Sequence, residues 1–280
     1  MFWYVSELLI AAGTLLLLLA SVELGFRFGR THDRADATIE SHLGMLQGSM
    51  LGLLALLLGF TFSLSVDRFE TRKALVVEEA NDIGTTWLRT DFLQPDDGSA
   101  ARALLERYMH SRLRFYDAGI DVAELERATQ EASDLQRDLW DIATRASASE
   151  PESHPVALFV QTLNNLIDDS EKRMAALNNH VPDAVIVFLL CIASVAAILI
   201  GFGSGLAGFR RPILNASFCL TLALVTMLIL DIDRPRRGFI TVSQGSMERL
   251  ASAMATEDET GSRESQGESA ATPGANGSPQ

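Results

Sequence analysis

Carboxylates that could hold a metal ion occur in this sequence as adjacent pairs. Three such pairs are Glu78 and Glu79, Asp96 and Asp97, and Asp168 and Asp169. Because adjacent side chains on a helix point in different directions, such a pair does not present two ligands to one ion. We interpret all three pairs as solvated faces and turns, and we predict no metal site and no cofactor.

Sequence motifs of catalytic sites are absent from the chain. The 5 histidines are scattered, and there is no His-Glu-x-x-His, Gly-x-Ser-x-Gly or phosphate-binding glycine loop. The long apolar runs also lack paired acids and histidines, which disfavours an enzyme working inside a membrane. We therefore predict that the protein is not an enzyme.

A stripe of small residues gives a sharper pattern. Its members recur every three or four positions along one apolar run: Gly44, Gly48, Gly52, Ala55, Gly59 and Ser63. Small residues at this spacing let a second helix approach closely, so the stripe, and Gly44, Gly48, Gly59 and Ser63 in particular, predicts helix packing. The alternative is that the stripe or its neighbours line a pore in an oligomer.

The elements that carry these residues are membrane spans. Four apolar runs, 5–26, 43–66, 184–206 and 212–230, reach the roughly 20 residues needed to cross a bilayer. The first run lacks a basic leader and a small-residue cleavage site, so it is not a signal peptide. The second run continues without proline into a charged helical pattern, which predicts one helix that leaves the membrane.

The middle of the chain predicts a bundle of four antiparallel helices. Apolar residues recur at helical spacing in four segments, interrupted by turn signals at 95–98, at Gly119 and at 147–155. The residues expected to face inward are Phe69, Val76, Ala80, Ile83, Trp87, Ala101, Leu104, Leu105, Tyr108, Phe115, Val122, Leu125, Ala132, Leu135, Leu139, Ile142, Phe159, Leu163, Leu166, Ile167, Met174 and Leu177. The predicted fold class is therefore an all-α membrane protein whose helical bundle lies between spans two and three.

Five regions follow from this pattern. They are a first transmembrane hairpin (1–66), a soluble bundle (67–181), a second hairpin (182–230), a juxtamembrane segment (231–255) and a tail (256–280). The tail has almost no apolar content, which predicts disorder. The net charge of −13 argues against a nucleic-acid partner. Basic residues near the spans are more numerous on the bundle side, which predicts a cytoplasmic bundle.

Two strings carry a resemblance to a known family. The string at 58–69, LGFTFSLSVDRF, resembles the pore-helix motif of bestrophins, and 231–239, DIDRPRRGF, resembles their acidic segment after the last span. The order of spans and insert also fits. The chain as a whole, up to the tail, resembles the bacterial bestrophin-like family of membrane proteins.

The resemblance implies a pore and an assembly. Bestrophins are pentameric anion channels whose second helix lines a hydrophobic neck, and Gly52, Leu56 and Phe60 occupy the three neck positions. Gly52 departs from the family, which has a bulky apolar residue there. The resemblance thus implies a homo-oligomer in the lipid bilayer of the bacterial inner membrane that passes chloride or other small anions.

The acidic segment departs from the family more strongly. In calcium-gated relatives an acidic run helps to form a calcium clasp, whereas here Arg234, Pro235 and two further arginines follow Asp231 and Asp233. Two carboxylates are too few for calcium, so none is predicted. We interpret the arginines as juxtamembrane charges that pair with Asp231, Asp233 or anionic lipid. The alternative to a channel is a membrane-anchored sensor or scaffold, since a bundle held between spans also resembles bacterial ligand-sensing modules.

Overall fold

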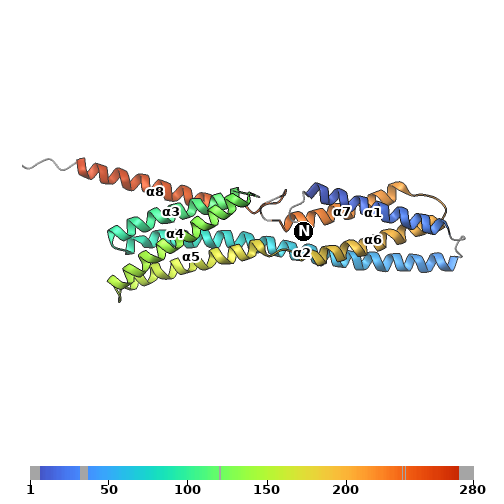
Figure 1. The fold of residues 1–280 in the computed structure, drawn as a ribbon, viewed down its shortest axis with the longest axis horizontal. Helices are drawn as coiled ribbons and strands as arrows, with labels where there is room; N and C mark the ends of the chain where they lie inside the picture. Colours follow the sequence, from blue (N-terminus) through green and yellow to red (C-terminus); the bar gives the residue numbers. More distant parts are fainter. Residues whose placement is uncertain (1–6, 32–36, 120, 235, 237, 271–280) are drawn as a thin grey trace, which may run out of the picture. The chain divides into compact units, whose positions relative to one another are not determined.

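The computed structural model describes residues 7–31, 37–119, 121–234, 236 and 238–270, and it describes the side chains of these residues except those of 7, 37–40 and 258–270. All regular structure in this part of the chain is helical (Figure 1). The helices are α1 (Glu7–Arg30), α2 (Ala37–Arg89), α3 (Pro95–Asp117), α4 (Val122–Ser149), α5 (His154–Asn178), α6 (Asp183–Leu206), α7 (Pro212–Ile232) and α8 (Gly245–Ala270), with a short 3-10 turn, η2, at Thr90–Phe92. The all-α prediction is confirmed.

The chain divides into two compact units. Unit 1 comprises 1–72 and 176–242, and unit 2 comprises 73–175 and 243–280. Four helices of the described residues are long and apolar enough to cross a membrane, and they include α1, α2, α6 and α7, the helices of unit 1. As predicted, α2 is one unbroken helix of 53 residues, so its later turns belong to unit 2.

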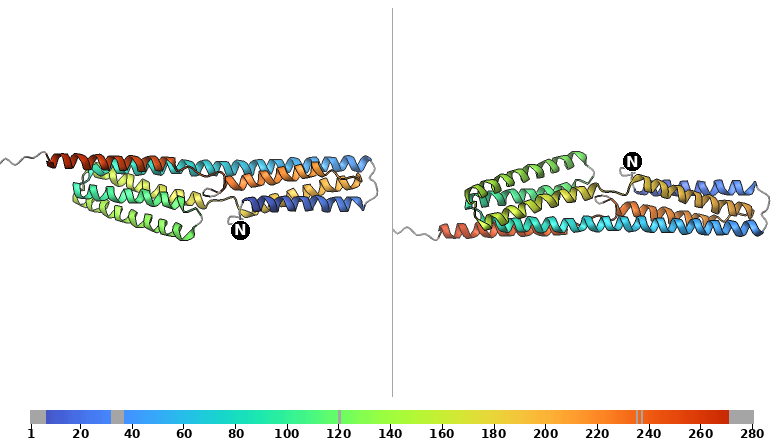
Figure 2. Two further views of the ribbon diagram at one scale, coloured as in Figure 1. Left: turned by 90° about the horizontal axis from the view of Figure 1, so that it is seen from above. Right: turned by 90° about the horizontal axis from the view of Figure 1, so that it is seen from below.

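Unit 1 packs its helices around small residues. α1 contacts both α6 and α7, and these three helices lie side by side with the first part of α2 in both views of Figure 2. Their shared core contains Leu18 and Val22 of α1, Leu54 of α2, Leu189 of α6 and Cys219 of α7. The exposed residues of α1, α6 and α7 are largely bulky and apolar, as expected where helices face hydrocarbon.

Glycines bring α1 and α6 into backbone contact. A Cβ atom added at Gly25 would lie 2.0 Å from the carbonyl oxygen of Ile198, and one added at Gly201 would lie 2.0 Å from that of Val22. Gly29 and Gly205 are equally close to the opposite backbone, at 2.3 and 2.4 Å. Two small-x-x-x-small pairs thus interlock across this helix pair, and larger side chains would force the helices apart.

Unit 2 is the predicted bundle, with one added helix. The end of α2, α3, α4 and α5 bury most of the residues expected to face inward, and α8 packs against α3. Five of these residues are half-buried: Phe69, Leu104, Leu125, Ile167 and Met174. Val122 is the exception, because it is 58% exposed. It is the first residue of α4, whose N-cap Asp121 accepts hydrogen bonds from Ala123 N and Glu124 N, so Val122 precedes the first turn that packs.

Local signals at the helix ends have mixed outcomes. Gly119, expected to end a helix, follows α3 with a φ of +53°, a conformation that glycine adopts at low cost. The expected turn at 95–98 is instead the first turn of α3, because Pro95 occupies its N-terminal position and Asp96 and Asp97 favour a helix start. Residues 256–270, expected in the tail, continue α8, and 271–280 lie outside the described residues.

Candidate functional site

One face of α2 is left uncovered by the rest of unit 1. At about 3.6 residues per turn, Gly52, Leu56, Gly59 and Ser63 lie within a narrow arc of the helix. All four are exposed, and a Cβ atom added at either glycine would meet no other described residue within 4 Å. Leu56 is 54% exposed.

The uncovered face is broad. Gly44 and Gly48 extend it toward the start of α2 and are equally open, while Phe60, 65% exposed, lies on its flank. The opposite face carries Leu54, Thr61 and Ser65, all buried. We call the exposed residues Gly44, Gly48, Gly52, Leu56, Gly59, Phe60 and Ser63 the open face of α2.

The open face brings two predictions together. The residues predicted to pack against a helix and the candidate neck residues Gly52, Leu56 and Phe60 all lie on it. Within the described part of the chain the glycines of this face pack against nothing, and the close helix contact is made by Gly25, Gly29, Gly201 and Gly205 instead. The sequence signal for those four was present, since each pair is spaced by four residues.

A second site gathers charge at the end of unit 1. The guanidinium of Arg72 donates to three backbone oxygens: Ala176 at 3.0 Å, Asn179 at 2.8 Å and Asp233 at 2.9 Å. Its Nη2 also lies 3.6 Å from Asp233 Oδ1, and Arg68 approaches the same oxygen at 4.0 Å. Arg72 and Asp233 are both buried, and this arginine connects α2 to the last turn of α5 and to the residues that follow α5 and α7.

The two aspartates of the acidic segment act as acceptors for backbone amides. Val181 N donates to Asp233 Oδ2 at 2.8 Å, and Ile240 N donates to Asp231 Oδ2 at 3.0 Å. Gly238, with a φ of +92°, approaches Asp231 so closely that a Cβ atom there would lie 1.9 Å from Oδ1. Both carboxylates therefore hold the chain at the end of α7. Arg234 is also buried, and Pro235 lies outside the described residues.

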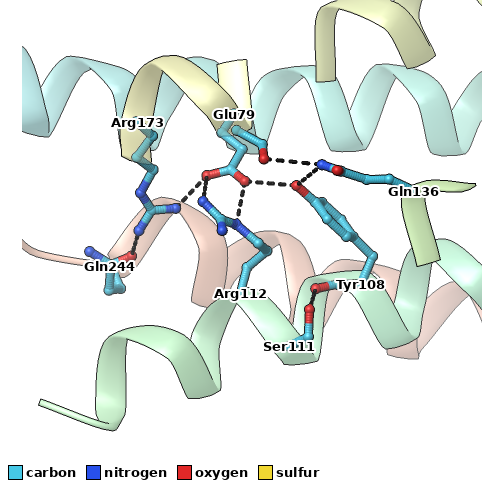
Figure 3. A network of polar contacts seen from close by, with 8 residues as sticks. Glu79, Tyr108, Ser111, Arg112, Gln136, Arg173 and Gln244 are labelled. Carbon is cyan, nitrogen blue, oxygen red and sulfur yellow. Dashed lines mark hydrogen bonds and ion pairs between the residues drawn. The ribbon is translucent and has the colours of Figure 1, made fainter. Parts of the chain in front are cut away.

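A third site lies in the core of unit 2 (Figure 3). Glu79 is fully buried and accepts hydrogen bonds from two buried arginines, Arg112 at 2.5 and 3.1 Å and Arg173 at 2.5 Å. The Tyr108 hydroxyl donates to Glu79 Oε1 at 3.1 Å, and Arg173 also donates to Gln244 at the start of α8. The interpretation of Glu78 and Glu79 as a solvated pair is therefore wrong for Glu79.

Burial and charge set the protonation states in this cluster. Burial, reinforced by the negative charge of Glu79, raises the pKa of Tyr108 above its ordinary value, so the phenol remains a donor. Burial alone would lower the pKa of Arg112, but the carboxylate of Glu79 holds it above its ordinary value. The cluster thus contains one carboxylate and two guanidinium ions, removed from water. Among the described residues, no three His, Cys, Asp or Glu side chains are grouped to hold a metal ion.

A pattern in the sequence could have revealed the cluster. Glu79 falls on the apolar stripe of α2 between Val76 and Ile83, Arg112 follows Tyr108 by one turn, and Arg173 precedes Leu177 by one turn. A charge on a stripe that faces a core is rarely left unpaired. Three such charges on three helices predict a buried ion cluster.

Fold and sites together define a multi-pass helical membrane protein. A family model described as a Bestrophin-like domain matches residues 13–247, and the chain belongs to this family. Comparison with curated protein sequences gives no match. The resemblance proposed from the strings at 58–69 and 231–239 is therefore confirmed at the level of the family.

Solved structures with a similar fold include crystal structures of a bacterial bestrophin homolog. A crystal structure of a bacterial bestrophin homolog from Klebsiella pneumoniae aligns with a TM-score of 0.62 at 17% identity, covering 89% of this chain and 98% of that one. A variant of that homolog gives the same TM-score and identity over 91% of this chain and 98% of its own. At this identity the likeness establishes the fold.

Proposed function

We propose that the chain is one subunit of a homo-oligomeric ion channel of the bestrophin type, in which the open faces of α2 surround a central pore. The observation that carries this proposal is the open face itself, a contiguous uncovered surface on the longest span. By the family resemblance, the assembly is a pentamer in the bacterial inner membrane with its bundle in the cytoplasm. Closed rotational symmetry suits a ring of this kind.

The composition of the open face supports a pore or a subunit contact better than a lipid contact. Elsewhere in unit 1 many exposed residues are bulky, for example Leu16 on α1, Phe188 on α6 and Leu224 on α7. The open face carries four glycines and Ser63 beside Leu56 and Phe60. Lipid-facing positions favour large apolar side chains, whereas small residues and hydroxyls favour close helix contact or water.

The candidate constriction is formed by Leu56 and Phe60. Rings of apolar side chains can gate a pore by excluding water, and the edges of phenylalanine rings carry a partial positive charge that suits passing anions. Gly52 would leave the pore wider one turn away. Small anions such as chloride are thus the proposed permeant species.

Oligomeric state and flux test this proposal. Native mass spectrometry of the purified protein in detergent should show a pentamer, and liposomes containing it should release chloride. Leu56→Ala and Phe60→Ala should each change the flux at least a few-fold. Leu16→Ala, which truncates an exposed leucine on α1, should leave the flux unchanged. A monomer or dimer, or flux unaffected by all three substitutions, would reject the pore and favour the sensor or scaffold alternative.

A further inference from the structure

A cavity opens at the end of unit 1 where α6 ends and α7 begins. It has a volume of about 440 Å³ and is bordered by the first apolar turn of α2, the last turns of α6 and the first turns of α7. This volume lies within the range of roughly 300–1,000 Å³ that is usual for small-molecule sites. Since the uncharged run of α2 begins at Leu43, the cavity lies at the predicted boundary between hydrocarbon and headgroups.

The lining of this cavity is amphipathic. Its polar part contains Arg211, Asn215, Gln47 and Ser204. Its apolar part is built from the side chains of the same three helices: Leu43, Ile200, Leu206, Leu214 and Phe218. A ligand that fills both parts needs a polar group next to an apolar chain.

Arg211 supplies the available charge. Its neighbour Arg210 is engaged, because it donates to Glu23 at 2.8 and 3.1 Å and lies over the ring of Phe26. Arg211 is exposed, lies over the ring of Phe209, and pairs with no carboxylate of the described residues. An exposed guanidinium can form two parallel hydrogen bonds to a phosphate group.

Gln47 and Gly203 shape the floor of the cavity. Gln47 Nε2 donates to the carbonyl oxygen of Leu199 at 2.7 Å, and a Cβ atom at Gly203 would lie 2.9 Å from that nitrogen. The glycine therefore lets the amide reach α6 and fixes the distance between α2 and α6 here. The floor is held by a specific contact, which favours a formed site over a transient gap.

We propose that this cavity binds an anionic phospholipid, with its phosphate on Arg211 and Asn215 and the start of an acyl chain against Leu214 and Phe218. Anionic headgroups are attracted to basic residues at the membrane boundary, and the apolar wall adds a chain that free phosphate lacks. The site does not depend on the channel proposal, because it is formed within one chain.

Lipid retention in native mass spectrometry tests the site. The full-length protein is titrated with phosphatidylglycerol, phosphatidylcholine or inorganic phosphate, as wild type, Arg211→Gln and Arg27→Gln. Arg27 is the control, since it lies in the same unit, is 76% exposed and carries the same charge, but is paired with Glu23 and does not line the cavity. We expect phosphatidylglycerol to bind the wild type and Arg27→Gln alike, and Arg211→Gln to weaken binding at least five-fold.

The remaining arms separate the sources of the phosphate. Inorganic phosphate should not compete with phosphatidylglycerol at equal concentration, and phosphatidylcholine should bind less tightly. Equal affinity of Arg211→Gln and Arg27→Gln would overturn the proposal. Competition by inorganic phosphate would do so too, because it would assign the site to a free anion. Weaker binding of phosphatidylglycerol by Asn215→Ala would support the proposal independently of charge removal at Arg211, and unchanged binding would contradict the phosphate contact at Asn215.

Discussion

Different interactions stabilise the interior of each of the two units. In unit 1, α1 and α6 meet through glycines at backbone distance, and the buried charges of Arg72 and Asp233 lie at the end of the spans. In unit 2 the charges of Glu79, Arg112 and Arg173 lie in the middle of the core. Packing of small residues suits hydrocarbon, where burial of apolar surface gives no driving force between helices.

The difference also concerns what is left uncovered. Unit 2 buries the apolar faces of its helices and exposes their polar faces, as a water-soluble bundle does. Unit 1 covers one face of α2, whereas the glycines of the open face meet no other residue of the described part of the chain. The surface proposed to contact further subunits therefore lies in unit 1, whereas the ion cluster of unit 2 is formed within one chain.

The largest expected effect comes from the cluster in unit 2. Glu79→Gln leaves two buried guanidinium ions without their carboxylate, which should destabilise the bundle by about 3–5 kcal/mol. The control is Glu78→Gln, because the neighbouring side chain is exposed and its loss should change stability by less than about 0.5 kcal/mol. The loss of stability in each variant is measured by thermal unfolding in detergent. Equal effects would show that the cluster does not hold the bundle.

The glycine contact in unit 1 should give the next largest effect. Gly25→Val places side-chain atoms where the backbone of Ile198 lies, so α1 and α6 must separate, at a cost of about 3 kcal/mol. Gly13→Val on the same helix meets no described residue within 4 Å and serves as the control. The unfolding temperature and the resistance to proteolysis, both measured in detergent, should fall for Gly25→Val alone. Matched losses in the two variants would point to helix propensity instead of the contact.

Prediction from sequence succeeded where one periodic pattern decides the structure. The unbroken α2 followed from a proline-free run, and the inward face of the bundle followed from apolar spacing, because burying an apolar stripe is the main requirement there. The prediction that Val122 faces inward was wrong, because the first residue of a helix precedes its packed turns. The prediction that Glu79 is solvated was wrong, because Glu78 and Glu79 were interpreted as a pair although only Glu79 lies on the buried stripe.

The candidate site on α2 could be predicted only in part. The small-residue stripe on α2 was visible, but spacing alone does not tell whether the partner of a stripe belongs to the same chain. In the structure α1 packs closely against α6 through four glycines: Gly25, Gly29, Gly201 and Gly205. The glycines of the stripe on α2 make no such contact with the described residues. Contacts between distant segments therefore decide the question, and one helical pattern does not contain them.

The smallest effect should come from an exposed charge that continues the open face. Asp67 follows the uncharged run of α2 on the same arc as Leu56 and Phe60, and its side chain is exposed. In the proposed pore, a ring of these carboxylates would lie near the mouth and oppose anions, because like charges repel over about a Debye length of 8–10 Å. Asp67→Asn should raise chloride permeability relative to sodium about two- to five-fold, measured from reversal potentials in planar bilayers.

The control for this last substitution uses a carboxylate of unit 2. Glu78→Asn removes the same charge from an exposed position on the part of α2 that belongs to the bundle. Because the electrostatic effect of an exposed charge falls steeply with distance in water, it should change the permeability ratio less than Asp67→Asn does. Equal shifts would mean that net charge alone sets selectivity, and no shift in either variant would place the open face of α2 away from the ion path.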